Sequence, residues 1–110
     1  MKITNQTRNT TLSNKTIVPT SKLDQSLGLL KHKTPIAMLL KTRFGIHTFA
    51  MPYAIDVLIL DKTNQVAAIK ENLNPNQIFL WNPKYKTVLE LPEGTIKKTK
   101  TKIKDVIQIK

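Results

Sequence analysis

One apolar stretch in the middle of the chain constrains the fold more than any other feature. Residues 54–60 read Ala-Ile-Asp-Val-Leu-Ile-Leu, and alternate positions of such a run lie on opposite faces of a strand. Both faces are then mostly apolar, which is typical of a strand covered on both sides. Pro52 stands just before the run, where its missing N–H does least harm to a strand ladder. The stretch therefore predicts a central β-strand.

Turn residues on either side of this strand divide the chain into further short elements. Residues 61–64, Asp-Lys-Thr-Asn, favour a turn, and Val66 to Ile69 then form the returning strand of a hairpin. A loop is expected at residues 71–75, a short helix from Ser21 to Leu30 and one helical turn from Thr95 to Lys100. Other strands are expected at residues 36–40, 84–91 and 102–109, and a first strand is expected to begin near Thr11 or Lys15 and to end at Val18. Residues 78–81 form either a short strand or a tucked apolar loop. This pattern predicts a mainly β protein, a sandwich or distorted barrel of about seven strands.

The length and composition predict a single domain. The chain has 110 residues, of which 1–14 are polar and read as a frayed terminus, and 15–110 form one β domain. The absence of cysteine excludes disulfides, thiolate catalysis and cysteine-ligated metal sites. No segment reaches the ~20 apolar residues that span a bilayer, and no secretory signal is present. A cytoplasmic location is the default expectation, with export after removal of a leader as the alternative.

The charge balance is strongly basic. Lys and Arg total 18 against 7 acidic residues, but only Arg8 and Arg43 are arginines. Because bidentate recognition of bases and phosphates favours arginine, a sequence-specific nucleic-acid reader is disfavoured. The densest basic run comprises Lys97, Lys98, Lys100, Lys102 and Lys104. We expect either a salt-dependent polyanion-binding or nucleic-acid-binding surface there, or a solvated lysine-rich surface.

Three titratable residues are candidates for chemistry. His47 is a potential general base, metal ligand or anion contact, or a structural histidine at a strand entrance. Asp56 falls on a mostly apolar strand face and needs a partner, which we expect to be His47, Arg43, Lys41 or backbone amides. Glu90 either faces a cleft with Asp56 or is a solvated residue beside Lys86. One histidine and two distant carboxylates do not have metal-ligand spacing, so no metal or cofactor is predicted.

Aromatic and apolar residues alternate just before the central strand. Phe49, Met51 and Tyr53 either line a ligand pocket or form part of the core. Neither a phosphate-binding glycine-rich loop nor a Gly-x-Ser-x-Gly nucleophile motif is present.

The ordered segments of the chain resemble those of a known family. Its members carry segments like Ile46-His47-Thr48-Phe49-x-Met51, Ile55-Asp56-Val57 and Leu60-Asp61, and also like Leu27-Gly28-Leu29-Leu30, Val88-Leu89-Glu90-Leu91-Pro92-x-Gly94-Thr95 and Ile103-Lys104-Asp105-Val106-Ile107. From about Leu23 to its C-terminus, the chain thus resembles the Domain of Unknown Function 192 family. The resemblance implies a small, mostly β, jelly-roll-like sandwich or barrel, and it implies no activity.

Two positions depart from the pattern of that family. Pro52-Tyr53-Ala54 stands where members often have an Arg-Phe-Pro-like segment, so a ligand contact by that arginine is not expected. Lys104 stands where a glycine usually precedes the aspartate, which argues against a tight turn there.

Three functional hypotheses follow. The first is a small ligand-binding module with a site near the segment from His47 to Asp61. For this module a binding role is favoured over catalysis, and a monomer is expected with a dimer as the alternative. The expected ligand-binding residues are His47, Thr48, Phe49, Met51, Asp56 and Glu90. The second is a polyanion-binding protein that uses the run from Lys97 to Lys104. The third is a hydrolase-like enzyme in which His47 acts with Asp56 or Glu90.

Overall fold

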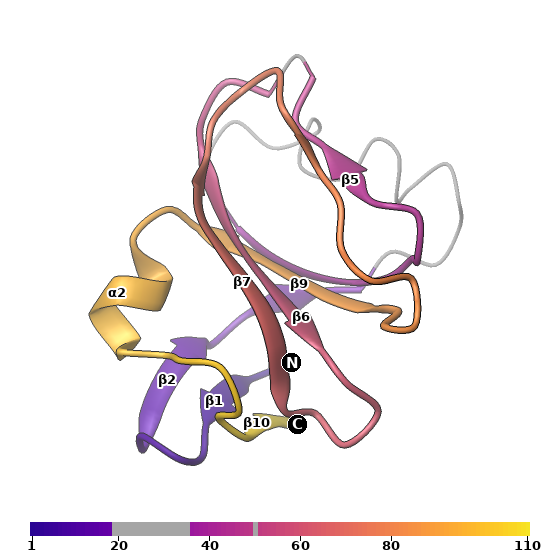
Figure 1. Cartoon of the computed structure of the whole chain (residues 1–110). Coiled ribbons are helices and arrows are strands. Elements are labelled where there is room, and N and C mark those ends of the chain that lie inside the picture. The colour runs from indigo at the N-terminus through magenta and orange to yellow at the C-terminus, as the bar shows by residue number, and fades with distance from the viewer. Residues whose placement is uncertain (19–35, 50) are drawn as a thin grey trace.

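The computed structural model describes residues 1–18, 36–49 and 51–110. Within these ranges the protein is mainly β, as predicted, with ten strands and one short helix (Figure 1). In chain order, the elements are β1 (Ile3–Asn5), β2 (Thr10–Ser13), β3 (Thr16–Ile17), β4 (Ala37–Lys41), β5 (Ile46–His47), β6 (Ile55–Leu60), β7 (Val66–Leu73), β8 (Ile78–Phe79), β9 (Thr87–Pro92), α2 (Thr95–Thr99) and β10 (Ile107–Ile109). The predicted helix from Ser21 to Leu30 lies outside the described residues.

A five-stranded sheet forms the middle of the molecule, in the order β3-β4-β9-β6-β7. Strand β6 pairs antiparallel with β9 on one side and β7 on the other, and all of its residues are buried. The prediction of a strand covered on both sides is therefore confirmed. The turn after it is closed by the Asp61 carboxylate, which accepts hydrogen bonds from the backbone N–H groups of Thr63 and Gln65.

Two smaller sheets cover the two faces of this sheet. The sheet β10-β1-β2 and helix α2 bury one face through a core that we call the α2-side core. Its members include Ile3, Leu12, Leu58, Leu60, Leu89, Leu91, Ile96 and Ile107. The pair β5 and β8, which we call the β5–β8 ribbon, packs on the other face through a ribbon-side core. That core includes Met38, Leu40, Val57, Ile59 and Val88, and the described strands form a layered structure without a closed barrel.

The prediction of a frayed terminus over residues 1–14 is wrong. Strand β1 pairs with both β10 and β2, and the side chains of Ile3 and Leu12 are buried in the α2-side core. Strands this short carry too few residues to show a period-two pattern, so the polar composition concealed them.

Two predicted boundaries also differ from the structure. Strand β7 continues to Leu73 through the residues expected to form a loop. The closing strand is shorter than predicted, because residues 102–105 form a turn in which Asp105 accepts a hydrogen bond from the Lys102 N–H. Lys104 has a φ of 75° in this turn, so the turn forms with a lysine in the left-handed conformation that glycine adopts more easily. The predicted helical turn after Thr95 is confirmed as α2.

Candidate functional site

Glu90 is a buried carboxyl in the interior of the central sheet. It lies opposite Met38 of β4 and Val57 of β6, and directly opposite residues of paired strands share a face. Both neighbours belong to the ribbon-side core, so Glu90 faces that core and not α2. Its side chain is only 7% exposed, which makes the prediction of a solvated glutamate beside Lys86 wrong. Burial raises the pKa of Glu90 to about 7, since water can no longer solvate the charged form.

A pocket of about 530 Å³ opens beside Glu90. It is lined by the end of β4, the loop that follows, strand β5, Lys86 just before β9 and Glu90 within β9. The lining residues are Leu40, Lys41, Thr42, Arg43, Phe44, Gly45, Ile46, His47, Lys86 and Glu90. The sequence-predicted residues His47 and Glu90 therefore line one pocket, although 43 positions separate them in the chain (90 − 47).

The charged groups around this pocket are mostly cationic. Lys41 donates a hydrogen bond from Nζ to the Thr87 hydroxyl at 2.9 Å, and Arg43 donates from Nη1 to the Pro83 carbonyl at 3.3 Å. Lys86 contributes a third basic side chain. Tyr53 is half-buried close to this region, where burial and then the negative charge of Glu90 raise its pKa. A negatively charged ligand would thus meet three cations and one carboxyl that is easily protonated.

His47 is exposed and held in a defined orientation. Its ring stacks on Phe49 with centroids 4.8 Å apart, and its Nδ1 accepts a hydrogen bond from the Phe49 N–H at 3.3 Å. A neutral imidazole that accepts at Nδ1 carries its proton on Nε2, which is then a hydrogen-bond donor.

Asp56 lies on the opposite face of the sheet from Glu90. It is opposite Leu91, a member of the α2-side core, and is fully buried. Its carboxylate accepts hydrogen bonds from the backbone N–H groups of Ile96 at 2.9 Å and Asn72 at 3.1 Å. Of its expected partners, backbone amides are confirmed. The predicted pairs of Asp56 with His47 and with Glu90 do not form. Successive side chains of β6 point to opposite faces of the sheet, and that of Asp56 points away from the pocket.

The family model of Domain of Unknown Function 192, described as "Uncharacterized ACR", matches residues 3–109. The chain belongs to the Domain of Unknown Function 192 family. In this member, the aspartate of the Ile55-Asp56-Val57 segment links β6 to α2, and Glu90 of the Val88–Thr95 segment faces the pocket. No curated protein matches the chain.

Two solved structures share the fold. One is a protein of unknown function from Novosphingobium aromaticivorans DSM 12444, with a TM-score of 0.81 and 14% identity over 98% of this chain and 82% of that one. The other is described as a "putative transcription regulator" from Sinorhizobium meliloti 1021, with a TM-score of 0.77 and 16% identity over 97% of this chain and 89% of that one. Identities this low show the similarity of fold alone. Within the described ranges, no helix has the length and apolar character needed to span a bilayer.

The other residues predicted to bind a ligand do not line the pocket. Thr48 is fully buried, and its hydroxyl donates to the Asn74 carbonyl and accepts from the Gln77 N–H at 2.9 Å. Thr48 therefore ties the loop before β8 to β5. Met51 is buried in the ribbon-side core, and Phe49 is half-exposed at the surface. Phe49, Met51 and Tyr53 are thus not one pocket wall.

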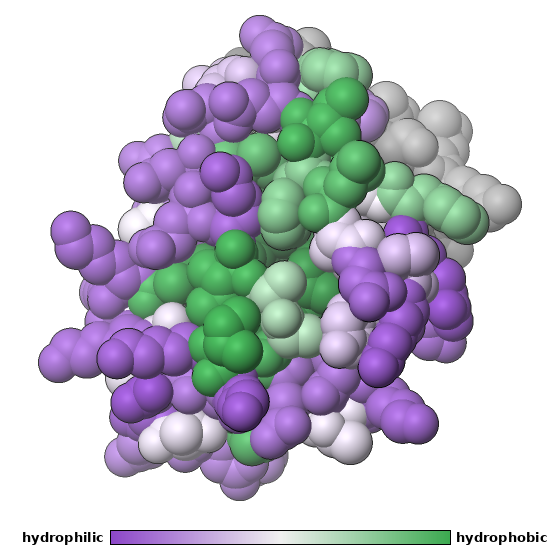
Figure 2. Space-filling view, viewed as in Figure 1, coloured by the Kyte–Doolittle hydropathy of each residue, from purple (hydrophilic) through white to green (hydrophobic). Residues whose placement is uncertain are grey.

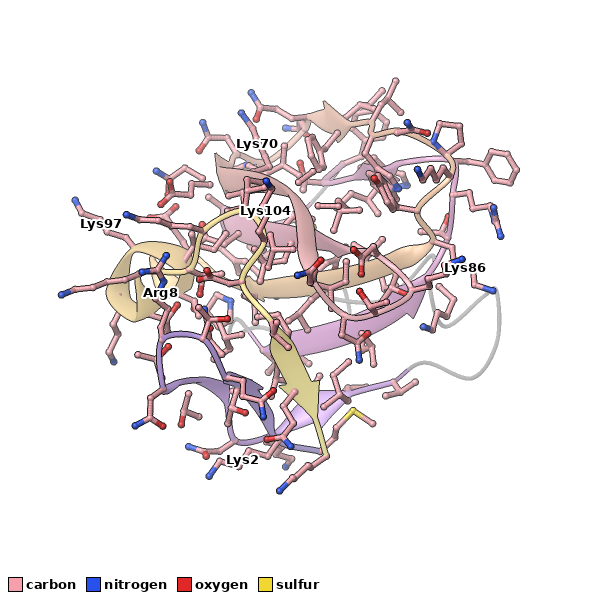
Figure 3. The ribbon with its side chains drawn as sticks, turned by 60° about the horizontal axis from the view of Figure 1, so that its bottom comes forward. Lys2, Arg8, Lys70, Lys86, Lys97 and Lys104 are labelled. Atoms are coloured by element: carbon pink, nitrogen blue, oxygen red, sulfur yellow. The ribbon has the colours of Figure 1, made fainter. Side chains whose placement is uncertain are left out.

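The basic run from Lys97 to Lys104 is divided between several parts of the surface. Lys97, Lys100 and Lys102 line a hollow of about 700 Å³ together with Arg8 and Glu71. Lys98 lines a different hollow, beside β2. In Figure 3, Lys97 and Arg8 project from the α2 end of the molecule, and Lys86 projects from the opposite end. The polyanion-binding hypothesis stays a prediction, with fewer lysines on one face than the sequence suggests.

Sequence reasoning missed the role of the loop before β5 and of Lys86. Lys41 and Arg43 were considered only as partners for Asp56, whereas both line the pocket with Glu90. One signal was available in the sequence, because residues 36–54 and 74–89 contain Lys41, Arg43, Lys84 and Lys86 but no acidic residue. Such an acid-free pair of segments indicates a locally positive region if the two segments meet in the fold.

Proposed function

We propose that this protein is a small-molecule binding module whose pocket beside β5 accepts an organic anion. The observation that carries the proposal is the composition of the pocket: the buried carboxyl of Glu90 lies in the same pocket as Lys41, Arg43 and Lys86. A pocket of about 530 Å³ is within the range that small ligands occupy in proteins.

The chemistry of the lining indicates the class of ligand. Arg43 presents a planar guanidinium suited to a carboxylate or phosphate group, and Lys86 adds a second positive charge. Leu40, Phe44 and Ile46 supply apolar contacts for the rest of the molecule. Near neutral pH, Glu90 is protonated part of the time and can then donate a hydrogen bond to an anionic oxygen. A small carboxylate or phosphate ester with an apolar portion fits this arrangement.

The experiment is a thermal-shift screen of small carboxylates and phosphate esters, followed by calorimetric titration of the hits. We expect Arg43→Ala and Lys86→Ala to weaken the binding of a hit by about 10- to 100-fold each, the usual cost of losing a charged hydrogen bond. Lys84→Ala is the matched control, because Lys84 is exposed nearby but does not line the pocket.

Two results would overturn the proposal. One is a screen in which no anion stabilises the wild-type protein. The other is a hit whose affinity falls equally in the Lys84→Ala variant, because that would show attraction to general positive charge instead of a pocket.

A further inference from the structure

The outer face of the β5–β8 ribbon is apolar and exposed. The side chains of Leu80, Ile78 and Phe49 are 67%, 61% and 47% exposed, and Phe44 next to the ribbon is 88% exposed. These four account for most of the large exposed apolar side chains in the described residues. In Figure 2, apolar side chains gather over the part of the surface where Figure 1 places β5. Clusters of this kind on a protein surface usually mark a contact site.

The register of the ribbon explains why these side chains point outward. Ile46 lies opposite Phe79, and both pack against the ribbon-side core. Their neighbours His47 and Ile78, also opposite each other, therefore project from the outer face. Leu80 follows at the next outward position, and its Cδ2 atom would lie 2.4 Å from a Cβ atom placed on Gly45. Glycine at position 45, whose φ is 95°, thus leaves room for Leu80 on this surface.

Among the described residues, the exposed charges of the ribbon and its flanks are basic. Arg43, Lys84 and Lys86 are exposed, and residues 36–54 and 74–89, which supply the ribbon and its flanks, contain no acidic residue. The acidic residue that follows in the sequence, Glu90, is buried. The surface therefore presents bulky apolar groups with a basic surround.

We propose that the outer face of the β5–β8 ribbon docks on the surface of an anionic lipid bilayer. Phe44, Ile78 and Leu80 would enter the boundary between headgroups and acyl chains, and Arg43, Lys84 and Lys86 would contact anionic headgroups. Lysine favours this partner over a protein, because lysine is depleted at protein–protein interfaces while it is attracted to acidic lipids. The basic surround favours an anionic partner, since a neutral or basic partner would gain nothing from these positive charges.

This inference does not rest on the proposed ligand pocket, and different residues test it. Phe44, Arg43 and Lys86 line the pocket as well, so they are left unchanged in the experiment. Ile78, Leu80 and Lys84 do not line the pocket and carry the test. Failure of one proposal can therefore be distinguished from failure of the other.

The experiment is cosedimentation of the full chain with vesicles of phosphatidylcholine alone or with one third phosphatidylglycerol, at low and physiological salt. We expect the protein to bind the vesicles that contain phosphatidylglycerol, and we expect physiological salt to weaken this binding. The double variant Ile78→Ser/Leu80→Ser is expected to lower the partition coefficient at least roughly tenfold. Lys84→Glu, which reverses one charge, is expected to lower it roughly five- to thirtyfold.

Matched controls lie outside the β5–β8 ribbon and its flanks. Ile103→Ser removes an exposed apolar side chain, and Lys97→Glu makes the same change in net charge as Lys84→Glu. Both controls should bind vesicles as the wild type does, and thermal unfolding confirms that every variant is folded. Lack of binding to anionic vesicles would overturn the proposal. An equal loss of vesicle binding in the Lys84→Glu and Lys97→Glu variants would also overturn it. Self-association or capture of a protein through Ile78 and Leu80, without vesicle binding, would assign the face to a protein partner and overturn it as well.

Discussion

Two carboxyl groups of the central sheet show how the surroundings of a residue set its role. Asp56 receives hydrogen bonds from two backbone amides, which compensate for its burial. Glu90 is buried on the other face of the sheet, and the lost hydration raises its pKa. Both residues lie in apolar runs of the sequence, so the run itself does not distinguish a structural carboxylate from one beside a pocket.

The raised pKa of Glu90 predicts a pH dependence of stability. Below the pKa of the unfolded state, about 4.3, the carboxyl is protonated in both states. Between that pH and about 7 only the unfolded state ionises, so the free energy of unfolding falls as pH rises and then levels off. The total fall attributable to Glu90 is about 3.5 kcal/mol. We expect Glu90→Gln to remove this fall, as measured by urea unfolding between pH 4.5 and 8.

Glu93→Gln provides the matched control, because Glu93 is exposed and three positions further along the chain. It should leave the pH dependence of the wild type unchanged. If the free energy of unfolding of the Glu90→Gln variant falls with pH as steeply as that of the wild type, Glu90 is solvated in the folded protein.

At the scale of elements, helix α2 depends on its tertiary contacts. It has five residues, too few for a helix to be stable by intrinsic propensity. Gly94 at its N-cap has no side chain to cap the helix, and Asp56 from β6 binds the Ile96 N–H instead. Ile96 is buried in the α2-side core and fixes the helix against the sheet.

Replacement of Asp56 therefore tests whether its hydrogen bond to the Ile96 N–H stabilises this helix. We expect Asp56→Ala to lower the free energy of unfolding by about 2–4 kcal/mol, because the buried Ile96 N–H and the partly buried Asn72 N–H lose their acceptor. Hydrogen exchange should accelerate at the Ile96 and Asn72 amides before other core amides. Glu71→Ala, at an exposed acidic residue, should change stability by less than about 0.5 kcal/mol. Unchanged exchange at Ile96 would contradict the capping role of Asp56.

At the scale of the whole molecule, the two ends of the chain are joined. Strand β1 pairs with β10, and Lys2 and Lys110 exchange backbone hydrogen bonds of 2.9 and 3.2 Å (Figure 1). Buried Asn5 donates to the carboxylate of Asp105 at 2.9 Å, and Arg8 forms a salt bridge with the same oxygen at 3.0 Å. These contacts close the small sheet over the α2-side core.

The Asp105 carboxylate predicts sensitivity to acid. Its burial acts to raise its pKa, but hydrogen bonds from Asn5, Arg8 and the Lys102 N–H outweigh burial and lower the pKa below its ordinary value. The stability that Asp105 contributes is thus present above about pH 4 and is lost as pH falls through the lowered pKa. Asp105→Ala should cost about 2–4 kcal/mol at neutral pH, measured by urea unfolding, and should reduce the acid-induced loss.

Arg8→Ala is the matched comparison for this network. Its side chain is partly exposed and makes one of several contacts to Asp105, so it should cost less than about 1.5 kcal/mol. If Arg8→Ala and Asp105→Ala lower the free energy of unfolding equally, the ion pair, and not the buried hydrogen bonds, stabilises the pairing of the two chain ends.

Local sequence patterns correctly predict the central strand, the turn after it, the helical turn at α2 and the mainly β class. Each depends on neighbouring residues: the apolar run of β6, the Asp61 side chain bound to its own turn, and the Pro-Glu-Gly break before Thr95. The sequence also identified His47 and Glu90 as residues to examine, and required a partner for Asp56. Short stretches of sequence were enough for these conclusions, because alternating burial in a strand and side-chain hydrogen bonds in a turn each involve only a few consecutive residues.

Which of these residues lie close together depends on the packing of distant segments, which local patterns do not predict. The register of β6 against β9 places Asp56 and Glu90 on opposite faces, and a shift of one residue would have reversed this. The polar N-terminus forms strands because β1 pairs on one side with the distant strand β10 and on the other side with β2. The pocket, the apolar face of the β5–β8 ribbon and the join between the chain ends all combine segments distant in sequence. Pairing between distant strands depends on how the whole chain packs, and no local pattern encodes it.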